Sequence, residues 1–450
     1  MASGVVGSSF LKFSRNIIID ALFISVLAVY ILAGTALTPF HADEATQIYM
    51  SHDFAYQFLQ GDLNQVIYHD PPISPQEQAL RMINGSVNKY LVGLAWHLAG
   101  LSVEQLNEQW DWGADYHYNM TTHHAPSQAL LMASRIPSAA LLATGVLWIF
   151  LIGIQLGGRP TAYLASLFYA LNPLLLINGR RAMMEGSFIA FTLLAVLAAI
   201  GWIKASDNRI WLAALLFGIA SGLALSSKHT ALFVVIPLFT ACFLSALARS
   251  IRKNTRQVGI LALVSLLLTG VLTALVFYFL NPVWWGDSLA RAGEVLAARG
   301  QLLSGQTAAF GGYSDISAAA SGFFRQAFIG LAQYFEVAGW ENHIGDQIAA
   351  YEASPWRVIA IGGSIVGGLI LFALTLVGLA RLFLKSPTAY GVRMVVLVWV
   401  AAALASTLLL TPLEWGRYYL PAIPAVGMLA AYGLAGLAEA LTGKLRGRTG

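Results

Sequence analysis

The stretch SFIAFTLLAVLAAIGWIKASDNRIWLAALLFGIASGLALSSKHTALFVVIPLFTACFLSALARS, residues 187–250, decides the fold class. It contains three apolar runs, and the short turns between them carry most of its charged residues. A helix that crosses a bilayer needs about 20 mostly apolar residues. This stretch therefore predicts three consecutive membrane-spanning helices.

Similar runs recur along the whole chain. Hydrophobic residues make up 57% of the 450 residues and charged residues 11%, a balance that a water-soluble domain does not need. The length criterion selects about ten spans. They lie near 17–38, 135–156, 161–178, 185–203, 210–227, 230–248, 259–281, 356–384, 393–411 and 420–440. We therefore expect an all-α polytopic membrane protein, in which residues 1–450 form a single membrane-embedded domain.

Lysines and arginines in the short loops predict the orientation, because these residues are enriched in cytoplasmic loops. A cytoplasmic N-terminus and C-terminus place nearly all of them on one side. They are Lys12, Arg15, Arg159, Lys204, Arg209, Arg249, Arg252, Lys253, Arg256, Arg381, Lys385, Lys444, Arg446 and Arg448. Two large loops, 39–134 and 282–355, then face the non-cytoplasmic side.

Both outer loops carry local structure signals. The run NKYLVGLAWHLAGL at 88–101 is apolar but too short to span, so it predicts an interfacial helix. The Gly-rich stretch SGQTAAFGGYSD at 304–315 predicts an irregular, mobile segment.

Composition also excludes two functional classes. The formal net charge is only +4, and the basic residues are grouped beside apolar segments, which argues against nucleic-acid binding. The single cysteine, Cys242, excludes a disulfide framework and a thiolate metal cluster.

The stretch HADEATQIY at 41–49 places Asp43 and Glu44 a few residues after the first predicted span. A carboxylate beside a bilayer is partly desolvated, which raises its affinity for a proton. This property suits a general base that deprotonates an acceptor hydroxyl. The alternative is a solvated loop start or a helix N-cap.

A second motif, LINGRRAMMEG at 176–186, places Arg180, Arg181 and Glu185 in an outer turn between two predicted spans. Arginine costs about 3 kcal/mol at the centre of a membrane helix on insertion scales, so it usually faces a polar cavity or a partner. Guanidinium groups bind phosphate through paired N–H donors. We interpret the turn as a site for a lipid phosphate, and the alternative is a structural pair of Arg180 with Glu185.

Two further cations, Lys228 and Arg417, lie at predicted helix ends on the same outer side. Each alone is typical of a side chain that extends to lipid headgroups. Their convergence is more informative, because the topology brings distant residues to one face. These residues are Asp43, Glu44, Lys89, Arg180, Lys228 and Arg417. Such a set predicts a cavity in which cations bind a phosphate and a carboxylate activates an acceptor.

Histidines crowd the first outer loop, but their spacing is not diagnostic of a metal site. Helical metal ligands sit three or four residues apart, whereas the adjacent His123 and His124 point to different sides. We therefore assign no metal site and no certain cofactor, and the alternative is a bound divalent cation.

Several motifs, in this order, resemble those of the protein O-mannosyltransferases and their bacterial relatives. The matching stretches are Asp43 with Glu44, RIPSAALLA at 135–143, GRRAMMEG at 179–186, GLALSSKHTALF at 222–233, NPVWWGD at 281–287 and RYYLPAIP at 417–424. The resemblance implies a C-type glycosyltransferase fold, with about ten or more transmembrane helices and two large non-cytoplasmic loops. It also implies polyprenyl-phosphate sugars as donors.

The resemblance implies a role for each matching residue. Asp43 matches the base that acts on the acceptor, and Glu44 an orienting or acceptor-binding group. The related aminoarabinose transferases use a lysine after the first-loop acid, and we assign Lys89 to that position. The residues assigned to the donor phosphate are Arg180, Arg417, Lys228 and Lys89, and the supporting residues are Glu185, Arg181 and Arg135.

The implied function is inverting transfer of a hexose, mannose above all, from polyprenyl phosphate to a hydroxyl of a protein, lipid or glycan. The implied location is the periplasmic or extracellular face of a bacterial plasma membrane. The alternative is a transporter or flippase of a lipid-linked or anionic substrate, which also needs charges among its spans. A noncatalytic scaffold would leave the embedded arginines unexplained.

Overall fold

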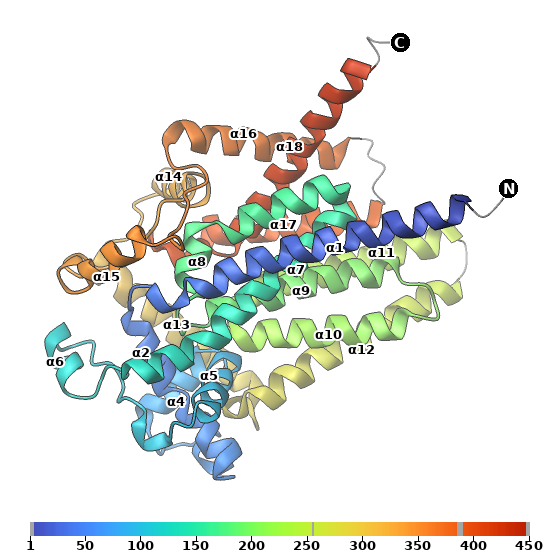
Figure 1. Cartoon of the computed structure of the whole chain (residues 1–450). Helices are drawn as coiled ribbons and strands as arrows, with labels where there is room; N and C mark the ends of the chain where they lie inside the picture. The colour runs from blue at the N-terminus through green and yellow to red at the C-terminus, as the bar shows by residue number, and fades with distance from the viewer. Residues whose placement is uncertain (1–3, 254–255, 385–389, 447–450) are drawn as a thin grey trace.

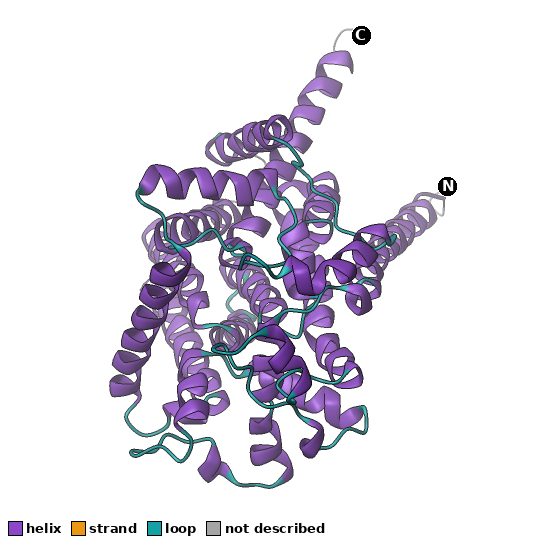
Figure 2. Cartoon of the chain, turned by 90° about the vertical axis from the view of Figure 1, so that its left-hand side faces the viewer, coloured by secondary structure: helices purple, strands orange, loops and turns teal. Residues whose placement is uncertain are grey.

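The computed structural model describes residues 4–253, 256–384 and 390–446, and within these ranges the chain forms helices and loops without a β-strand (Figure 2). Nine helices are long and apolar enough to cross a membrane. They are α1 (Gly4–Ala33), α7 (Gln128–Ala170), α9 (Glu185–Lys204), α10 (Ile210–Ser227), α11 (Leu232–Lys253), α12 (Arg256–Leu280), α16 (Ile365–Phe383), α17 (Tyr390–Leu410) and α18 (Ala422–Arg446). The predicted all-α polytopic fold is confirmed. Lys385 and Arg448, used above for orientation, lie outside the described residues.

Helix α7 accounts for the difference between nine helices and about ten predicted spans. Its 43 residues would extend about 65 Å at 1.5 Å per residue, twice the hydrocarbon thickness of a bilayer. The helix breaks at Gly157 and Gly158, where Gly158 has a positive φ of 74° that favours glycine. The chain therefore turns back here, and α7 makes two of the predicted passes. With ten passes, both termini lie at the same end of the bundle (Figure 1).

Two predicted span boundaries are wrong. The predicted span 161–178 is divided, because Pro173 keeps Asn172 out of the helical region and a separate helix, α8 (Pro173–Gly179), follows. The predicted span 356–384 begins later, at Ile365, after a turn in which Gly363 has a φ of 66°. The residues that flank both turns are apolar, so hydropathy did not reveal these interruptions.

The two outer segments fold into helices at the end of the bundle opposite the termini, all of them short except α13 (Figure 1). The first contains α2 (Ala42–Tyr49), α3 (His52–Phe54), α4 (Pro75–Ile83), α5 (Val87–Leu98) and α6 (Tyr116–Thr121). The second contains α13 (Ser288–Phe310), α14 (Ile316–Phe324) and α15 (Glu341–Ala353). The helix predicted at 88–101 is confirmed as α5. The prediction of an irregular segment from 304 is wrong as far as Phe310, because α13, capped by Asp287, continues through Gly305.

The helix bundle supports this outer layer. Helix α7 packs against α1, α9 and α18, and α9 packs against α10. A continuous apolar core runs through these contacts. The ends of these helices, and the turns between them, therefore meet the outer segments in fixed positions.

Candidate active site

The predicted site residues lie at the end of the bundle opposite the termini, some on turns between helices and others, such as Lys89 in α5 and Arg135 in α7, within helices. Asp43 and Glu44 are in the first turn of α2, and Arg180 and Arg181 follow α8. Lys228 lies between α10 and the short turn that begins α11, and Arg417 lies in a one-turn 3-10 helix before α18. Segments far apart in sequence are therefore brought to one end of the molecule.

Asp43 is the accessible member of the acidic pair. Its side chain is 25% exposed, and its carboxylate forms an ion pair with Arg417. The backbone N–H of Asp43 donates to Nδ1 of His41, which caps α2. The guanidinium of Arg417 also lies over the rings of Trp415 and Tyr418, 5.0 and 5.7 Å from their centroids. A partly exposed carboxylate and a largely buried arginine, from motifs far apart in the sequence, thus meet here.

Glu44 is fully buried and all its contacts are within the protein. Its two carboxylate oxygens accept from Nε and Nη2 of Arg135, each at 2.7 Å. The same oxygens also accept from the backbone N–H groups of Ala182 at 2.8 Å and His41 at 3.1 Å. Burial raises the pKa of Glu44, but Arg135 outweighs this and holds the pKa below its ordinary value. Glu44 therefore joins α2, α7 and the turn before α9.

Arg180 and Arg181 donate to protein carbonyl oxygens. Arg180 donates to Ile31 and Trp356, each at 2.8 Å, and to Tyr30 and the hydroxyl of Tyr351. Its guanidinium packs so closely on Gly34 that a Cβ there would lie 2.2 Å from Cζ of Arg180.

Arg181 likewise donates to Pro39 at 3.1 Å and to Tyr334 at 2.6 Å. Both arginines are fully buried and join the end of α1 to the second outer segment. In this arrangement the guanidinium N–H groups of Arg180 and Arg181 are hydrogen-bonded mainly to backbone carbonyl oxygens.

The alternative pairing of Arg180 with Glu185 is not the one observed, because Glu185 pairs with Lys228. Nζ of Lys228 lies 3.0 Å from Oε1 of Glu185. The other oxygen, Oε2, is buried and has no hydrogen-bond partner among the described residues. Within the described residues, one carboxylate oxygen at the start of α9 is therefore left without a donor, next to a lysine.

Lys89 lies in a separate charged cluster on the first outer segment. Its ammonium pairs with Asp53, which also accepts from Arg81 at 2.8 Å, and Arg81 contacts Glu77 at 2.6 Å. Lys89, Asp53 and Arg81 are all buried. The structure therefore places Lys89 with Asp53 rather than with the pair of Asp43 and Arg417.

This cluster predicts a stability change with pH. Burial raises the pKa of Asp53, but Lys89 and Arg81 outweigh it and hold the pKa below the ordinary value of 3.8. A depressed folded-state pKa contributes stability above the unfolded pKa, and this contribution is lost as the pH falls through the folded-state pKa. Asp53→Asn is expected to cost about 3 kcal/mol at neutral pH, and the difference from wild type should narrow only below about pH 4. Thermal unfolding of both proteins in detergent from pH 7 to 2.5 measures this difference in stability. Asp207→Asn, in an exposed turn, is the control. A constant difference across that range would contradict the assignment.

Several site residues were missed by the sequence analysis. Glu336, in the second outer segment, accepts from Nε2 of His41 at 2.6 Å and lies 3.8 Å from Nε of Arg417. No motif marks Glu336, and its position becomes meaningful only when the two outer segments meet.

A group of hydrogen-bond donors extends from Arg417 along the same end of the bundle. Arg299 on α13 donates to the carbonyl of Ile83, and the hydroxyl of Tyr418 donates to Gln306 on the same helix at 2.9 Å. The ring nitrogens of His229 and Nε1 of Trp284 are buried and have no hydrogen-bond partner in the described part of the chain. The two rings lie edge to face with centroids 5.6 Å apart. The indole of Trp284 and a neutral imidazole at His229 each supply one buried N–H donor, and such donors suit an anion. Two stretches quoted from the sequence belong to this region: GLALSSKHTALF, which contains His229, and NPVWWGD, which contains Trp284.

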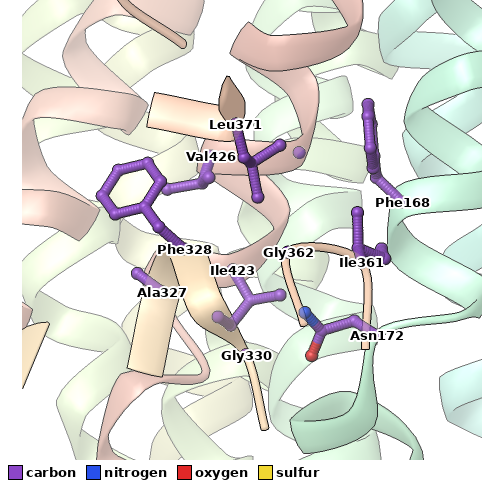
Figure 3. A pocket seen from close by; sticks show the side chains of 11 residues that line it. Phe168, Asn172, Ala327, Phe328, Gly330, Ile361, Gly362, Leu371, Ile423 and Val426 are labelled. Atoms are coloured by element: carbon purple, nitrogen blue, oxygen red, sulfur yellow. The ribbon is translucent and has the colours of Figure 1, made fainter. Parts of the chain in front are cut away.

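An apolar recess lies beside the first turns of α18. Figure 3 shows Phe328, Leu371, Ile423 and Val426 around it, with Asn172 as the labelled polar side chain. Ile423 follows Arg417 by six residues along the chain. One wall of the recess is therefore formed by the chain segment that follows Arg417. The recess lies on the side of the bundle formed by α16 and α18.

No group of three or more histidine, cysteine, aspartate or glutamate side chains that could hold a metal ion is found among the residues described. The cluster around Asp43 is instead a mixture of carboxylates and guanidinium groups, which neutralise one another.

Comparison with solved structures identifies the architecture. The chain superposes on the oligosaccharyltransferase AglB from Archaeoglobus fulgidus, solved with an inhibitory peptide and a dolichol-phosphate, with a TM-score of 0.50 and 13% identity over 92% of this chain and 50% of that chain. A second oligosaccharyltransferase structure from that organism, with zinc and sulfate, gives 0.52 and 16% over 93% and 49%. ArnT from Cupriavidus metallidurans, in the apo state, gives 0.51 and 12% over 92% and 59%. The chain has the C-type glycosyltransferase fold.

The C-type glycosyltransferase fold agrees with a family comparison. A family model described as dolichyl-phosphate-mannose-protein mannosyltransferase matches residues 107–284, less than half of the chain. The matched part includes Arg135, Arg180 and Lys228. The resemblance stated from the motifs is confirmed, and no curated protein sequence matches the chain. The chain spans about half the length of the archaeal structures that share its C-type glycosyltransferase fold.

Proposed function

We propose that the protein transfers a sugar from a polyprenyl-phosphate carrier to an acceptor hydroxyl on the non-cytoplasmic face of a bacterial plasma membrane. The observation that carries the proposal is the contact of Asp43 with Arg417. It places a partly exposed carboxylate and a guanidinium side by side at the end of the bundle where the outer segments gather. A transfer of this kind needs both groups, because a proton must leave the acceptor and a phosphate must leave the sugar.

In the proposed reaction, Asp43 acts on the acceptor and Arg417 acts on the donor phosphate. Asp43 takes the proton of the acceptor hydroxyl while that oxygen attacks the anomeric carbon. The bond from the anomeric carbon to the phosphate oxygen breaks, and the carrier leaves as polyprenyl phosphate. Arg417 stabilises the charge that develops on the phosphate, and attack from the opposite side inverts the anomeric centre.

Neighbouring donors support the position of the phosphate. Arg299 lies on α13, whose Gln306 accepts from Tyr418, and His229 and Trp284 hold buried nitrogens without a hydrogen-bond partner among the described residues. Lys228, next to His229, brings a further positive charge. We assign the start of the carrier chain to the apolar recess of Figure 3, because a prenyl tail needs an apolar surface and Ile423 of the recess follows Arg417 by six residues.

The remaining assigned residues act as supports in this proposal. Glu44 with Arg135 holds α2 in place, and Arg180 and Arg181 hold the end of α1 against the second outer segment. Mannose is the first sugar to test, because the matching family model is named for dolichyl-phosphate-mannose. Peptide, lipid and glycan hydroxyls are all retained as acceptors. The orientation with both termini cytoplasmic is part of the proposal.

Sugar transfer by Arg417→Gln tests the proposed donor site. Purified protein in nanodiscs is incubated with radiolabelled polyprenyl-phosphate sugars and a membrane extract that supplies acceptors. Wild type should transfer label, and Arg417→Gln should lower kcat by about 100-fold, the usual effect of removing one group that stabilises a developing anion.

Arg325→Gln is the matched control, because Arg325 is an exposed arginine paired with Glu414 only three residues before Arg417. It should behave as wild type. Equal losses in the two variants, or wild-type activity in Arg417→Gln, would contradict the assigned role. If folded wild type transfers no sugar but carries a lipid-linked substrate across proteoliposomes, the protein is a transporter instead.

A further inference from the structure

Arg417 lies between two carboxylates that differ in exposure. It pairs with Asp43, whose side chain is 25% exposed, and its Nε lies 3.8 Å from Oε1 of Glu336, whose side chain is 9% exposed. A phosphate that approaches from the open side therefore meets Arg417 beside Asp43. Glu336 remains behind the guanidinium.

His41 holds Glu336 in a defined orientation. Nδ1 of His41 accepts from the backbone N–H of Asp43 at 3.1 Å, so this nitrogen carries no proton. Nε2 then carries the hydrogen and donates to Oε2 of Glu336 at 2.6 Å. The side chain of His41 is also stacked on Trp340, with ring centroids 6.0 Å apart. Asp43, Arg417, Glu336 and His41 thus form a closed ring of contacts.

The protonation states agree with this geometry. Burial lowers the pKa of His41 and outweighs the opposite effect of Glu336, so His41 is neutral at neutral pH. Burial would raise the pKa of Glu336, but the hydrogen bond from His41 and the charge of Arg181 hold the pKa below the ordinary value. Glu336 is therefore the fixed negative charge of the ring.

We propose that Glu336, oriented by His41, is a positioning residue that retains Arg417 in the site when a phosphate draws the guanidinium away from Asp43. The proposal rests on the proposed function, since the phosphate is that of the lipid-linked donor. A carboxylate bound to a guanidinium accepts a proton less readily than a released one. Donor binding thus releases Asp43 to act on the acceptor.

Two variants have opposite expected effects on the affinity for undecaprenyl phosphate, measured by titration of the purified full-length protein in detergent. Asp43→Asn removes the carboxylate that competes for Arg417, so affinity should rise about threefold. Glu336→Gln should lower it about tenfold, because Arg417 loses the group that retains it. Removal of a negative charge by itself would raise affinity for an anion, so the sign separates positioning from general electrostatics.

Conservative variants separate positioning from a loss of structure. Glu336→Asp keeps the charge and should recover most of the affinity. His41→Asn keeps an N-cap for α2, because asparagine is a favoured cap, but removes the bond to Glu336. It should weaken phosphate binding in the same direction as Glu336→Gln, and it replaces that variant if Glu336→Gln fails to fold. Glu341→Gln, an exposed carboxylate in the same segment, should bind as wild type.

Unchanged or tighter binding by Glu336→Gln and His41→Asn overturns the proposal. Wild type that binds no undecaprenyl phosphate overturns it together with the proposed donor. The expected pattern of affinities in a protein that transfers no sugar supports the positioning role and overturns only the proposed reaction.

Discussion

Asp43→Asn is expected to lower kcat for sugar transfer by about 100-fold or more, the usual contribution of a general base. Asparagine has nearly the same shape as aspartate but cannot take the proton of the acceptor hydroxyl. The variant should fold, because the side chain is partly exposed and the cap of α2 comes from His41. Single-turnover transfer at saturating donor measures the chemical step separately from donor binding.

Asp346→Asn is the control for this change, because Asp346 is an exposed aspartate on α15. It should retain wild-type turnover. A folded Asp43→Asn protein with near-normal turnover would remove Asp43 from the role of base and leave its contact with Arg417 as a structural pair.

Arg135→Ala is expected to destabilise the protein by about 3–5 kcal/mol, because it leaves Glu44 buried without its bidentate partner. Arg135 also donates to the carbonyl of Thr38 at 2.8 Å, so the variant loses a contact to the segment that follows α1. Protonation of Glu44 would limit the cost. Thermal unfolding in detergent, followed by tryptophan fluorescence, measures the loss.

A matched control lies on the same helix. Arg159 is 42% exposed and pairs with Asp20, so Arg159→Ala should leave the unfolding temperature close to that of wild type. The double variant Glu44→Gln with Arg135→Gln removes both charges and should recover part of the stability lost in Arg135→Ala. Similar unfolding temperatures for Arg135→Ala and Arg159→Ala would show that the buried pair contributes little.

Hydropathy alone predicted the membrane domain because a spanning helix is defined locally. Each apolar run satisfies its own backbone hydrogen bonds, and its length matches the bilayer. The same local rule failed at 161–178 and 356–364, because Pro173 and the turn at Gly363 interrupt the helices within apolar sequence. The helix at 304–310 was missed because one glycine in a helix lowers stability by only about 1 kcal/mol, which a good cap and packing offset.

The sequence by itself determined the class of the protein: the number of spans, the two outer segments and the charged turns that face one side. Only the tertiary structure decided which charged side chains are in contact with one another. Asp43 and Glu44 are adjacent in sequence, yet one is partly exposed beside Arg417 and the other is buried on Arg135. Arg180 and Arg417 were assigned the same role, yet Arg180 is occupied by backbone carbonyls. Glu336 carried no sequence signal because its partners, His41 and Arg417, lie 295 residues before it and 81 residues after it in the chain. Spans depend on residues that are neighbours in sequence, whereas the site depends on contacts formed when the outer segments pack together.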